Sequence, residues 1–175
     1  NKARFVLNVQ DLFPQNAIEL GVLRSPMQIR FFRALEGFAY RTAGVVMVHS
    51  DGNKQTLLGQ YPNLEDKLQV LHNWVDIDYH DSEFVEIDFR KKWNIHQKKV
   101  AIFAGVMGPS QYLELLLQVA EEMQNETELL FLLVGDGIEK ERLKKIARAK
   151  SLNNVRFEGF VSRKTYPDLL KICSI

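Results

Sequence analysis

Short apolar runs alternate with amphipathic segments along most of this chain. The runs are typical of strands in a parallel sheet, and they fall at residues 5–9, 45–48, 67–71, 100–104, 129–134 and 155–157. Apolar residues at helical spacing predict helices at 25–43, 50–61, 89–95, 112–123, 139–150 and 163–171. The alternation of the two patterns predicts an α/β protein with parallel sheets.

The spacing of the strands divides the chain. From Lys99 onward the strand starts recur at intervals of about thirty residues or less, as in the βαβαβ half of a mononucleotide-binding domain. We expect two Rossmann-like domains: residues 1–72 in the first, 99–175 in the second, and 73–98 as the connection. The chain begins with Asn1 rather than Met, and a strand pattern follows at once. We therefore expect an internal part of a longer polypeptide, with both domains incomplete.

Composition narrows the class of protein. Hydrophobic residues make up 46% of the 175 positions, charged residues 26%, and the formal net charge is +1. These values are typical of a globular α/β domain and do not favour nucleic-acid binding. The single cysteine, Cys173, offers neither a disulfide nor a metal cluster. No apolar run has the length that a transmembrane helix needs.

An acidic segment between residues 73 and 99 invites a metal-site interpretation. Its carboxylates and histidines include Asp76, Asp78, His80, Asp81, Glu83 and Glu86. Their spacing matches neither an EF-hand loop nor a histidine pair on one helix face. A solvated connection between domains accounts for the segment more simply, and we expect no metal.

The helix after Ser25 is basic and aromatic. Ser25 and Pro26 are typical of an N-cap and first helical residue. One predicted apolar face comprises Ile29, Phe32, Leu35, Ala39 and Ala43, and a second stripe comprises Arg30, Arg33, Gly37 and Tyr40 or Arg41. Phe31 and Phe38 widen the apolar surface. The pattern fits a core helix with solvated arginines, and it also fits a helix lying on an anionic membrane.

Glycines and carboxylates follow several predicted strands. Gly105 and Gly108 form a loop ahead of a helix whose N-terminus can attract an anion, although an ordinary βα turn is the alternative. Asp136 is expected to cap the next helix, with Glu139 completing a capping box. The sequence from Gly135 to Lys140 is not G-x-G-x-x-G, which argues against NAD or FAD, and there is no P-loop. Asp11 follows the first strand, where either chemistry or a simple turn can account for it.

Several motifs in order resemble the retaining GT-B glycosyltransferases of family 4 (group 1), of the bacterial surface-polysaccharide type. In the first predicted domain they are Asn8–Ala17, similar to v-x-D-L-W-P-x-x-a, Leu35–Ala43, similar to l-E-x-x-x-y-R-x-A, and Val48–Gly52, similar to v-x-S-x-g. Val70–Asp76 resembles v-i-x-N-g/w-v-D. Three further segments resemble the family's donor-domain motifs: Phe103–Gly108, Leu133–Gly137 and Asn154–Val161.

The resemblance implies a glycosyltransferase with a cleft between its two domains. A nucleotide-diphosphate sugar would bind the second domain, and the resemblance favours UDP as its nucleotide. A glycan or lipid-linked saccharide acceptor would bind the first domain. The product would belong to a surface polysaccharide such as lipopolysaccharide or capsule. The family usually needs no metal or other cofactor. It implies a cytoplasmic location, with peripheral contact at the inner membrane face as an open expectation.

Site residues follow from the same resemblance. Donor-binding positions are Gly105, Met107, Gly108, Ser110 and Gln111 near the phosphates, Gly135, Asp136 and Gly137 beside the nucleotide, and Glu158, Gly159, Phe160 and Val161 near the base. Asp11 matches the catalytic and acceptor side. Arg30 and Arg33 are expected on the membrane and acceptor side.

Departures from the family pattern keep two alternatives open. The family usually carries a basic residue and a glycine after the glycine loop, whereas here Gly108 is followed by Pro-Ser-Gln and Tyr112. Gln10 stands where a family histidine sometimes occurs. The sequence ends before the place where the family carries its E-x7-E motif, so we expect the fragment itself to be inactive. A nucleotide-sugar 2-epimerase of GT-B architecture and a degenerate, non-catalytic subunit are the alternatives.

Overall fold

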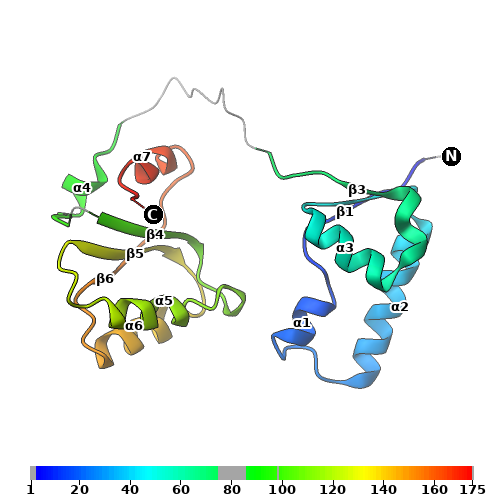
Figure 1. Cartoon of the computed structure of the whole chain (residues 1–175), viewed down its shortest axis with the longest axis horizontal. Coiled ribbons are helices and arrows are strands. Elements are labelled where there is room, and N and C mark those ends of the chain that lie inside the picture. The colour runs from blue at the N-terminus through cyan, green and yellow to red at the C-terminus, as the bar shows by residue number, and fades with distance from the viewer. Residues whose placement is uncertain (1–2, 75–85, 98, 175) are drawn as a thin grey trace. The chain divides into compact units, whose positions relative to one another are not determined.

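The computed structural model describes residues 3–74, 86–97 and 99–174 of the chain. The chain divides into two compact units, unit 1 at residues 1–77 and unit 2 at residues 78–175, and each is described by itself (Figure 1). Both are α/β units built on a three-stranded parallel sheet, as the apolar pattern predicts.

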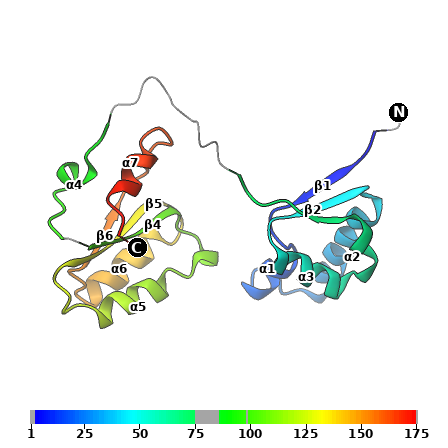
Figure 2. The same ribbon diagram turned by 45° about the horizontal axis from the view of Figure 1, so that its top comes forward.

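Unit 1 orders its strands β1 (Val6–Val9), β2 (Val45–Val48) and β3 (Leu68–Val70). Its helices are α1 (Gln15–Glu19), α2 (Pro26–Thr42) and α3 (Asp51–Gln60), and the 3-10 helix η1 (Pro62–Lys67) precedes β3. Both crossovers advance across the sheet in the same direction, so α2 and α3 lie on the same face (Figure 2). The core lies between these helices and the sheet around Val46, Val48 and Leu57.

Two polar contacts fix the helix ends of unit 1. The Ser50 hydroxyl accepts from the Asn53 N–H at 3.1 Å, which caps α3 as predicted. The Lys67 ammonium donates to the carbonyls of Tyr40 and Ala43 at 2.6 and 2.9 Å, which satisfies the C-terminal end of α2. Ser25 occupies the N-cap position of α2 but makes no side-chain capping bond, so only the position was predicted correctly.

The buried face of α2 differs from the predicted one. Gly37 and Tyr40, expected beside the arginines, are the buried residues of the helix, and Leu35, expected in the core, is 52% exposed. Gly37 packs against Tyr61, because a Cβ at this position would lie at an ordinary contact distance of 3.7 Å from the Tyr61 ring. The Tyr40 and Tyr61 rings then meet edge to face at 5.2 Å.

Unit 2 orders its strands β4 (Lys99–Val106), β5 (Leu129–Asp136) and β6 (Val155–Glu158). Helices α5 (Glu114–Glu122) and α6 (Lys140–Ala149) cover one face, and α4 (Phe89–Lys92) and α7 (Tyr166–Lys171) lie on the other (Figure 1). The short 3-10 helix η2 (Pro109–Gln111) precedes α5. Every residue of β5 except Asp136 is buried, because both faces of the central strand are covered.

The segment before β4 packs into unit 2. Residues 86–97 belong to the predicted connection, of which residues 75–85 and the acidic positions among them lie outside the described residues. Phe89 is buried with Leu132 and Leu169 in one core cluster. The Ile87 N–H donates to the Asp168 carboxylate at 3.0 Å. Hydrogen bonds from Lys171 and then Ile87 hold the pKa of Asp168 below its usual range.

The boundaries around the glycines are corrected by the structure. Strands β4 and β5 each run two residues beyond the predicted end, so Gly105 and Gly135 are paired strand residues rather than loop residues. Helix α5 begins at Glu114 instead of Tyr112. Asp136 does not cap α6: its carboxylate accepts from the adjacent Gly137 N–H, and Glu139 at the N-cap position makes no capping bond.

Candidate functional site

Three strand ends meet at one edge of unit 2. Gly105 pairs with Gly135, Val106 with Asp136, and Val134 with Glu158. The loops after β4, β5 and β6 therefore leave the sheet side by side at its carboxyl edge, where open parallel sheets bind ligands. All three predicted donor-binding segments, which are far apart in the sequence, begin at this edge.

Two of the five predicted site glycines are required by packing. A Cβ on Gly135 would lie 2.0 Å from the Gly105 carbonyl oxygen, and one on Gly137 would lie 2.4 Å from that of Met107. Both residues also have positive φ, 133° and 154°. A Cβ on Gly105 would make only an ordinary contact with Phe103, and one on Gly108 would meet nothing within 4 Å. Of these two, only Gly108 therefore leaves open space where a side chain would stand, and Gly105 could carry a Cβ without a clash.

A hollow of about 290 Å³ opens at this edge. Five predicted positions line it: Gly105, Gly135, Asp136, Phe160 and Val161. Tyr166 and Leu169 from α7 line it as well and were not predicted, because nothing in the sequence shows that α7 returns to this edge. Glu158 and Gly159 do not line the hollow, and they connect the end of β6 to Phe160 and Val161. Phe160 is 83% exposed.

The loop between β4 and α5 is bonded to itself and to β5. Met107 is 0% exposed, its N–H donates to Asp136 and its carbonyl accepts from Glu139, so its role is structural. The N–H groups of Gly108, Gln111 and Tyr112 donate to Val106, Gly108 and Pro109. Ser110 and Gln111 are exposed. Tyr112 has φ of 45°, a left-handed conformation that glycine adopts without strain.

Two cations of α6 support these loops. The Lys140 ammonium donates to the carbonyls of Gly135 at 2.7 Å and Glu158 at 3.0 Å, and so ties the end of β5 to that of β6. Sequence reasoning missed it, although a lysine opposing the dipole at a helix N-terminus is a signal. Arg142 borders a smaller hollow with Gly108 and Tyr112. Hydrogen bonds to Glu114 and then Glu139 raise the pKa of Arg142 and neutralise its charge.

The carboxyl edge of unit 1 carries side chains instead of glycines. Asp11 follows β1, is exposed, and lines a hollow of about 260 Å³ with Gln10, Glu36 and Tyr40. His49 and His72 follow β2 and β3, and the His72 Nδ1 lies 3.0 Å from the His49 carbonyl oxygen. Among the described residues, neither ring nitrogen of His49 has a hydrogen-bond partner, and both are buried.

A shared carboxylate fixes the wall of this hollow. Glu36 accepts from the Tyr40 hydroxyl at 3.0 Å and from the Tyr61 hydroxyl at 2.8 Å. The first bond spans one helical turn, which explains the E-x-x-x-y spacing physically. Burial, followed by the hydrogen bond to Glu36, raises the pKa of Tyr61 to about 12. Burial, followed by the charge of Glu36, raises the pKa of Tyr40 further above its usual value.

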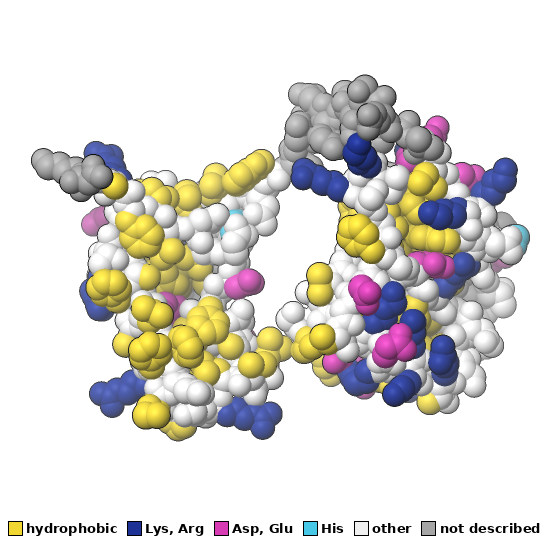
Figure 3. Space-filling model, turned by 180° about the vertical axis from the view of Figure 1, so that it is seen from behind, with side chains coloured by type: hydrophobic (Ala, Val, Ile, Leu, Met, Phe, Trp, Pro, Cys, Tyr) yellow, Lys and Arg dark blue, Asp and Glu magenta, His cyan; other side chains and the backbone are white. Residues whose placement is uncertain are grey.

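Helix α2 turns an apolar stripe away from its sheet. Met27, Phe31, Leu35 and Phe38 recur every three or four residues and are exposed, from 52% at Leu35 to 80% at Met27. Arg30 and Arg33 are exposed on the same helix. Figure 3 shows hydrophobic side chains gathered over unit 1 with cations at the margin. Within the described residues, no helix has the combined length and apolar content to cross a bilayer.

Metal-ligating side chains are not clustered in the described part of the chain. No group of three or more His, Cys, Asp or Glu residues lies close enough together there to hold an ion. The acidic positions 76–83 fall outside that part.

The two parallel units, with glycine-bearing strand ends in the second, define a protein of the GT-B glycosyltransferase fold. A family model described as glycosyl transferases group 1 matches residues 85–175, just over half of the chain. The chain therefore belongs to the group 1 glycosyl transferases, a family of enzymes, as the motifs predict.

Comparisons with individual proteins agree on the fold. The chain is 28% identical over 164 residues to "Probable glycosyltransferase WbjE" of Pseudomonas aeruginosa, covering 89% of this chain and 39% of the relative. Anabaena Alr3699/HepE in complex with UDP-glucose matches 98% of the chain with a TM-score of 0.70 and 20% identity. WaaG, described as a glycosyltransferase involved in lipopolysaccharide biosynthesis, matches 100% with a TM-score of 0.71 and 15% identity.

The chain spans only part of these relatives. It covers 39% of WbjE, 45% of HepE and 50% of WaaG. At identities of 15 to 20% the two structural likenesses establish the fold alone.

Proposed function

We propose that this chain is part of a glycosyltransferase that moves a sugar from a nucleotide diphosphate, UDP by preference, to a glycan or lipid-linked acceptor of a surface polysaccharide. The observation that carries the proposal is the convergence of three loop segments on the 290 Å³ hollow of unit 2. HepE, of the same fold, is described in complex with UDP-glucose. The retaining stereochemistry of the group that its motifs resemble is part of the proposal.

The donor phosphates would lie beside Gly105 and Gly108, and Gly108 leaves open space where a side chain would stand. Ser110 and Gln111 are exposed nearby, and Phe160 and Val161 would face the base. We propose that no metal takes part, and that backbone dipoles at the strand ends stabilise the leaving diphosphate. The acceptor would enter the hollow of unit 1 lined by Asp11 and Glu36, with Asp11 oriented toward the reacting sugar.

Calorimetric titration of the chain with UDP-glucose and with GDP-mannose, each in EDTA, tests the donor site. We expect one nucleotide to bind without metal. Val106→Trp should abolish binding, since Val106 lines the hollow and is 72% exposed, so a larger side chain would fill the hollow without disturbing the core. Val22→Trp, at a position of unit 1 that is 75% exposed and lies outside the hollow, is the matched control. Equal binding by both variants, or none by the wild type, contradicts the proposal.

A degenerate subunit is the second candidate function, and one observation favours it. The loop after β4 uses its N–H groups internally and carries a strained Tyr112 in place of the family's glycine. In that case neither nucleotide would bind in the presence or absence of Mg²⁺. The 2-epimerase alternative is not favoured by the family match.

We also propose that α2 contacts an anionic membrane. The support is the exposed stripe of Met27, Phe31 and Phe38 on a helix that also exposes Arg30 and Arg33. Co-sedimentation with phosphatidylglycerol vesicles should fall several-fold for Phe31→Ser and for Arg30→Gln with Arg33→Gln, and less for Phe160→Ser in unit 2. Equal sedimentation of all variants, or sedimentation with neutral vesicles alone, contradicts membrane contact.

A further inference from the structure

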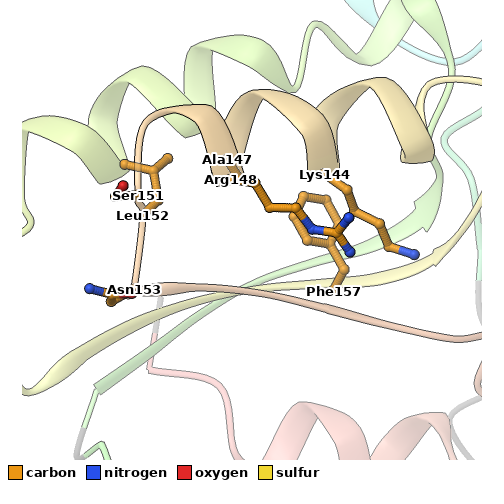
Figure 4. A pocket seen from close by; sticks show the side chains of 7 residues that line it. All are labelled: Lys144, Ala147, Arg148, Ser151, Leu152, Asn153 and Phe157. Carbon is orange, nitrogen blue, oxygen red and sulfur yellow. The ribbon is translucent and has the colours of Figure 1, made fainter.

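A groove runs along the outer edge of unit 2, between α6 and β6. It has a volume of about 490 Å³ and is open to solvent. Lys144, Ala147 and Arg148 of α6 form one wall, the loop from Ser151 to Asn153 closes one end, and Phe157 of β6 forms the floor (Figure 4). We call this the α6–β6 groove. It shares no residue with the hollow at the carboxyl edge.

Among the described strands, β6 pairs with β5 alone, and the backbone groups on its other side face outward. The Phe131 N–H donates to the Asn154 carbonyl, and Phe131 and Leu133 are in register with Val155 and Phe157. In a parallel ladder with this register, Asn154, Arg156 and Glu158 bond to β5. Val155 and Phe157 therefore direct their N–H and carbonyl groups away from β5, and Phe157 also lines the groove. Another extended segment can pair with such groups.

The charge of the groove is positive. Helix α6 carries five cations and one carboxylate, Glu141. Lys144 is paired with Glu141 at 2.8 Å. Arg148 has no ion-pair partner among the described residues, and it lies on the groove wall. A segment that pairs with β6 would thus place its side chains beside an unneutralised guanidinium, which favours carboxylates.

We propose that the α6–β6 groove is a docking surface for an acidic, extended peptide segment of a partner protein, which adds a strand to β6. A second copy of this chain fits less well, because pairing two β6 edges would bring two Arg148 side chains together. A small anion fits less well, because it would leave the backbone groups of Val155 and Phe157 without use, and the groove is open rather than enclosed. The short strand suits a short segment.

The test uses the full chain and a fluorescein-labelled eight-residue peptide of alternating Glu and Val. We expect binding that weakens as salt is raised, and affinity about tenfold lower for Arg148→Gln, about 1.4 kcal/mol. Arg148→Lys should retain most of the affinity. Lys145→Gln is the matched control, because Lys145 lies on the same helix outside the groove, and it should change affinity less than twofold.

A second measurement separates strand addition from charge attraction. The same peptide N-methylated at alternate residues keeps its carboxylates but cannot pair, and it should bind at least tenfold more weakly. Hydrogen exchange should show the amides of Val155 and Phe157 slowed by the unmodified peptide. Equal binding of the methylated peptide, equal losses in Arg148→Gln and Lys145→Gln, or absence of binding would each overturn the proposal.

Discussion

Units 1 and 2 share a three-stranded parallel sheet, yet their carboxyl edges are built from different parts. In unit 2 the backbones of β4 and β5 approach so closely that Gly135 and Gly137 leave no room for a Cβ. In unit 1 the corresponding edge presents the side chains of Asp11, His49 and His72. Backbone dipoles suit a diphosphate, and varied side chains suit a saccharide, so the difference is consistent with the donor and acceptor roles proposed for the two units.

The largest expected effect is the loss of Gly135. Gly135→Ala would place a Cβ 2.0 Å from the Gly105 carbonyl oxygen and force apart the two strand ends. We expect unit 2 to lose ~3–5 kcal/mol of unfolding free energy. Urea unfolding of a Trp74→Phe background, in which Trp93 emission reports unit 2, measures the loss. Gly108→Ala is the control and should change stability by less than ~0.5 kcal/mol. Similar losses in both would contradict the packing argument.

The counterpart in unit 1 is the Glu36 carboxylate, which accepts hydrogen bonds from two tyrosine hydroxyls. Glu36→Ala would leave the Tyr40 and Tyr61 hydroxyls without their shared acceptor. We expect unit 1 to lose ~2–3 kcal/mol, since Tyr40 is buried and its hydroxyl would be unsatisfied. Hydrogen exchange at β2 measures the change in unit 1, and Trp93 emission should show unit 2 unchanged. Glu19→Ala, which removes only an exposed bond from Gln15, is the control.

Part of this architecture could be predicted from the sequence and part could not. Short apolar runs located the six strands of the described residues, and Ser50 marked the start of α3, because burial and capping leave local signals. The buried face of α2 was predicted wrongly because contact between Gly37 and Tyr61 joins residues distant in sequence. The same limit explains why Met107 resembled a ligand contact although its side chain is in the core, and why Tyr166 was missed.

Two lysines extend the comparison. Lys140 donates to strand-end carbonyls of unit 2, whereas Lys67 donates to helix-end carbonyls of unit 1. Lys140→Met and Lys67→Met should each cost their own unit ~1–2 kcal/mol. Only Lys140→Met should also weaken UDP-glucose binding, because it releases the carbonyls of Gly135 and Glu158. The unfolding free energy of each unit and the calorimetric affinity for UDP-glucose measure these effects. Lys140→Arg should restore part of the affinity. A loss of affinity in Lys67→Met would remove the distinction.

Alkaline pH should affect unit 1 through its tyrosines. The folded state raises the pKa of Tyr61 from about 10 to about 12, and that of Tyr40 also rises. A raised pKa means that the folded state retains protons that the unfolded state releases, so stability is full below pH 10 and falls as pH rises toward 12. For the partly buried Tyr61 the loss is ~1 kcal/mol once solvent screening is taken into account. Unfolding of Tyr61→Phe, followed by hydrogen exchange at β2, should depend less on pH.

The smallest expected effect concerns Tyr112, the residue of the donor-side loop that departs most from the glycine pattern. Its φ of 45° is strained for an L-residue with a side chain, and its side chain is 66% exposed, so it contributes little packing. Tyr112→Gly should therefore stabilise unit 2 by ~0.5–1 kcal/mol, as the relieved strain exceeds the entropy that glycine adds to the unfolded chain. Tyr166→Gly, at the first turn of α7, should destabilise instead. If Tyr112→Gly also strengthens UDP-glucose binding, then the loop contacts the donor and Tyr112 lowers its affinity. If stability rises while affinity is unchanged, the loop does not hold the phosphates.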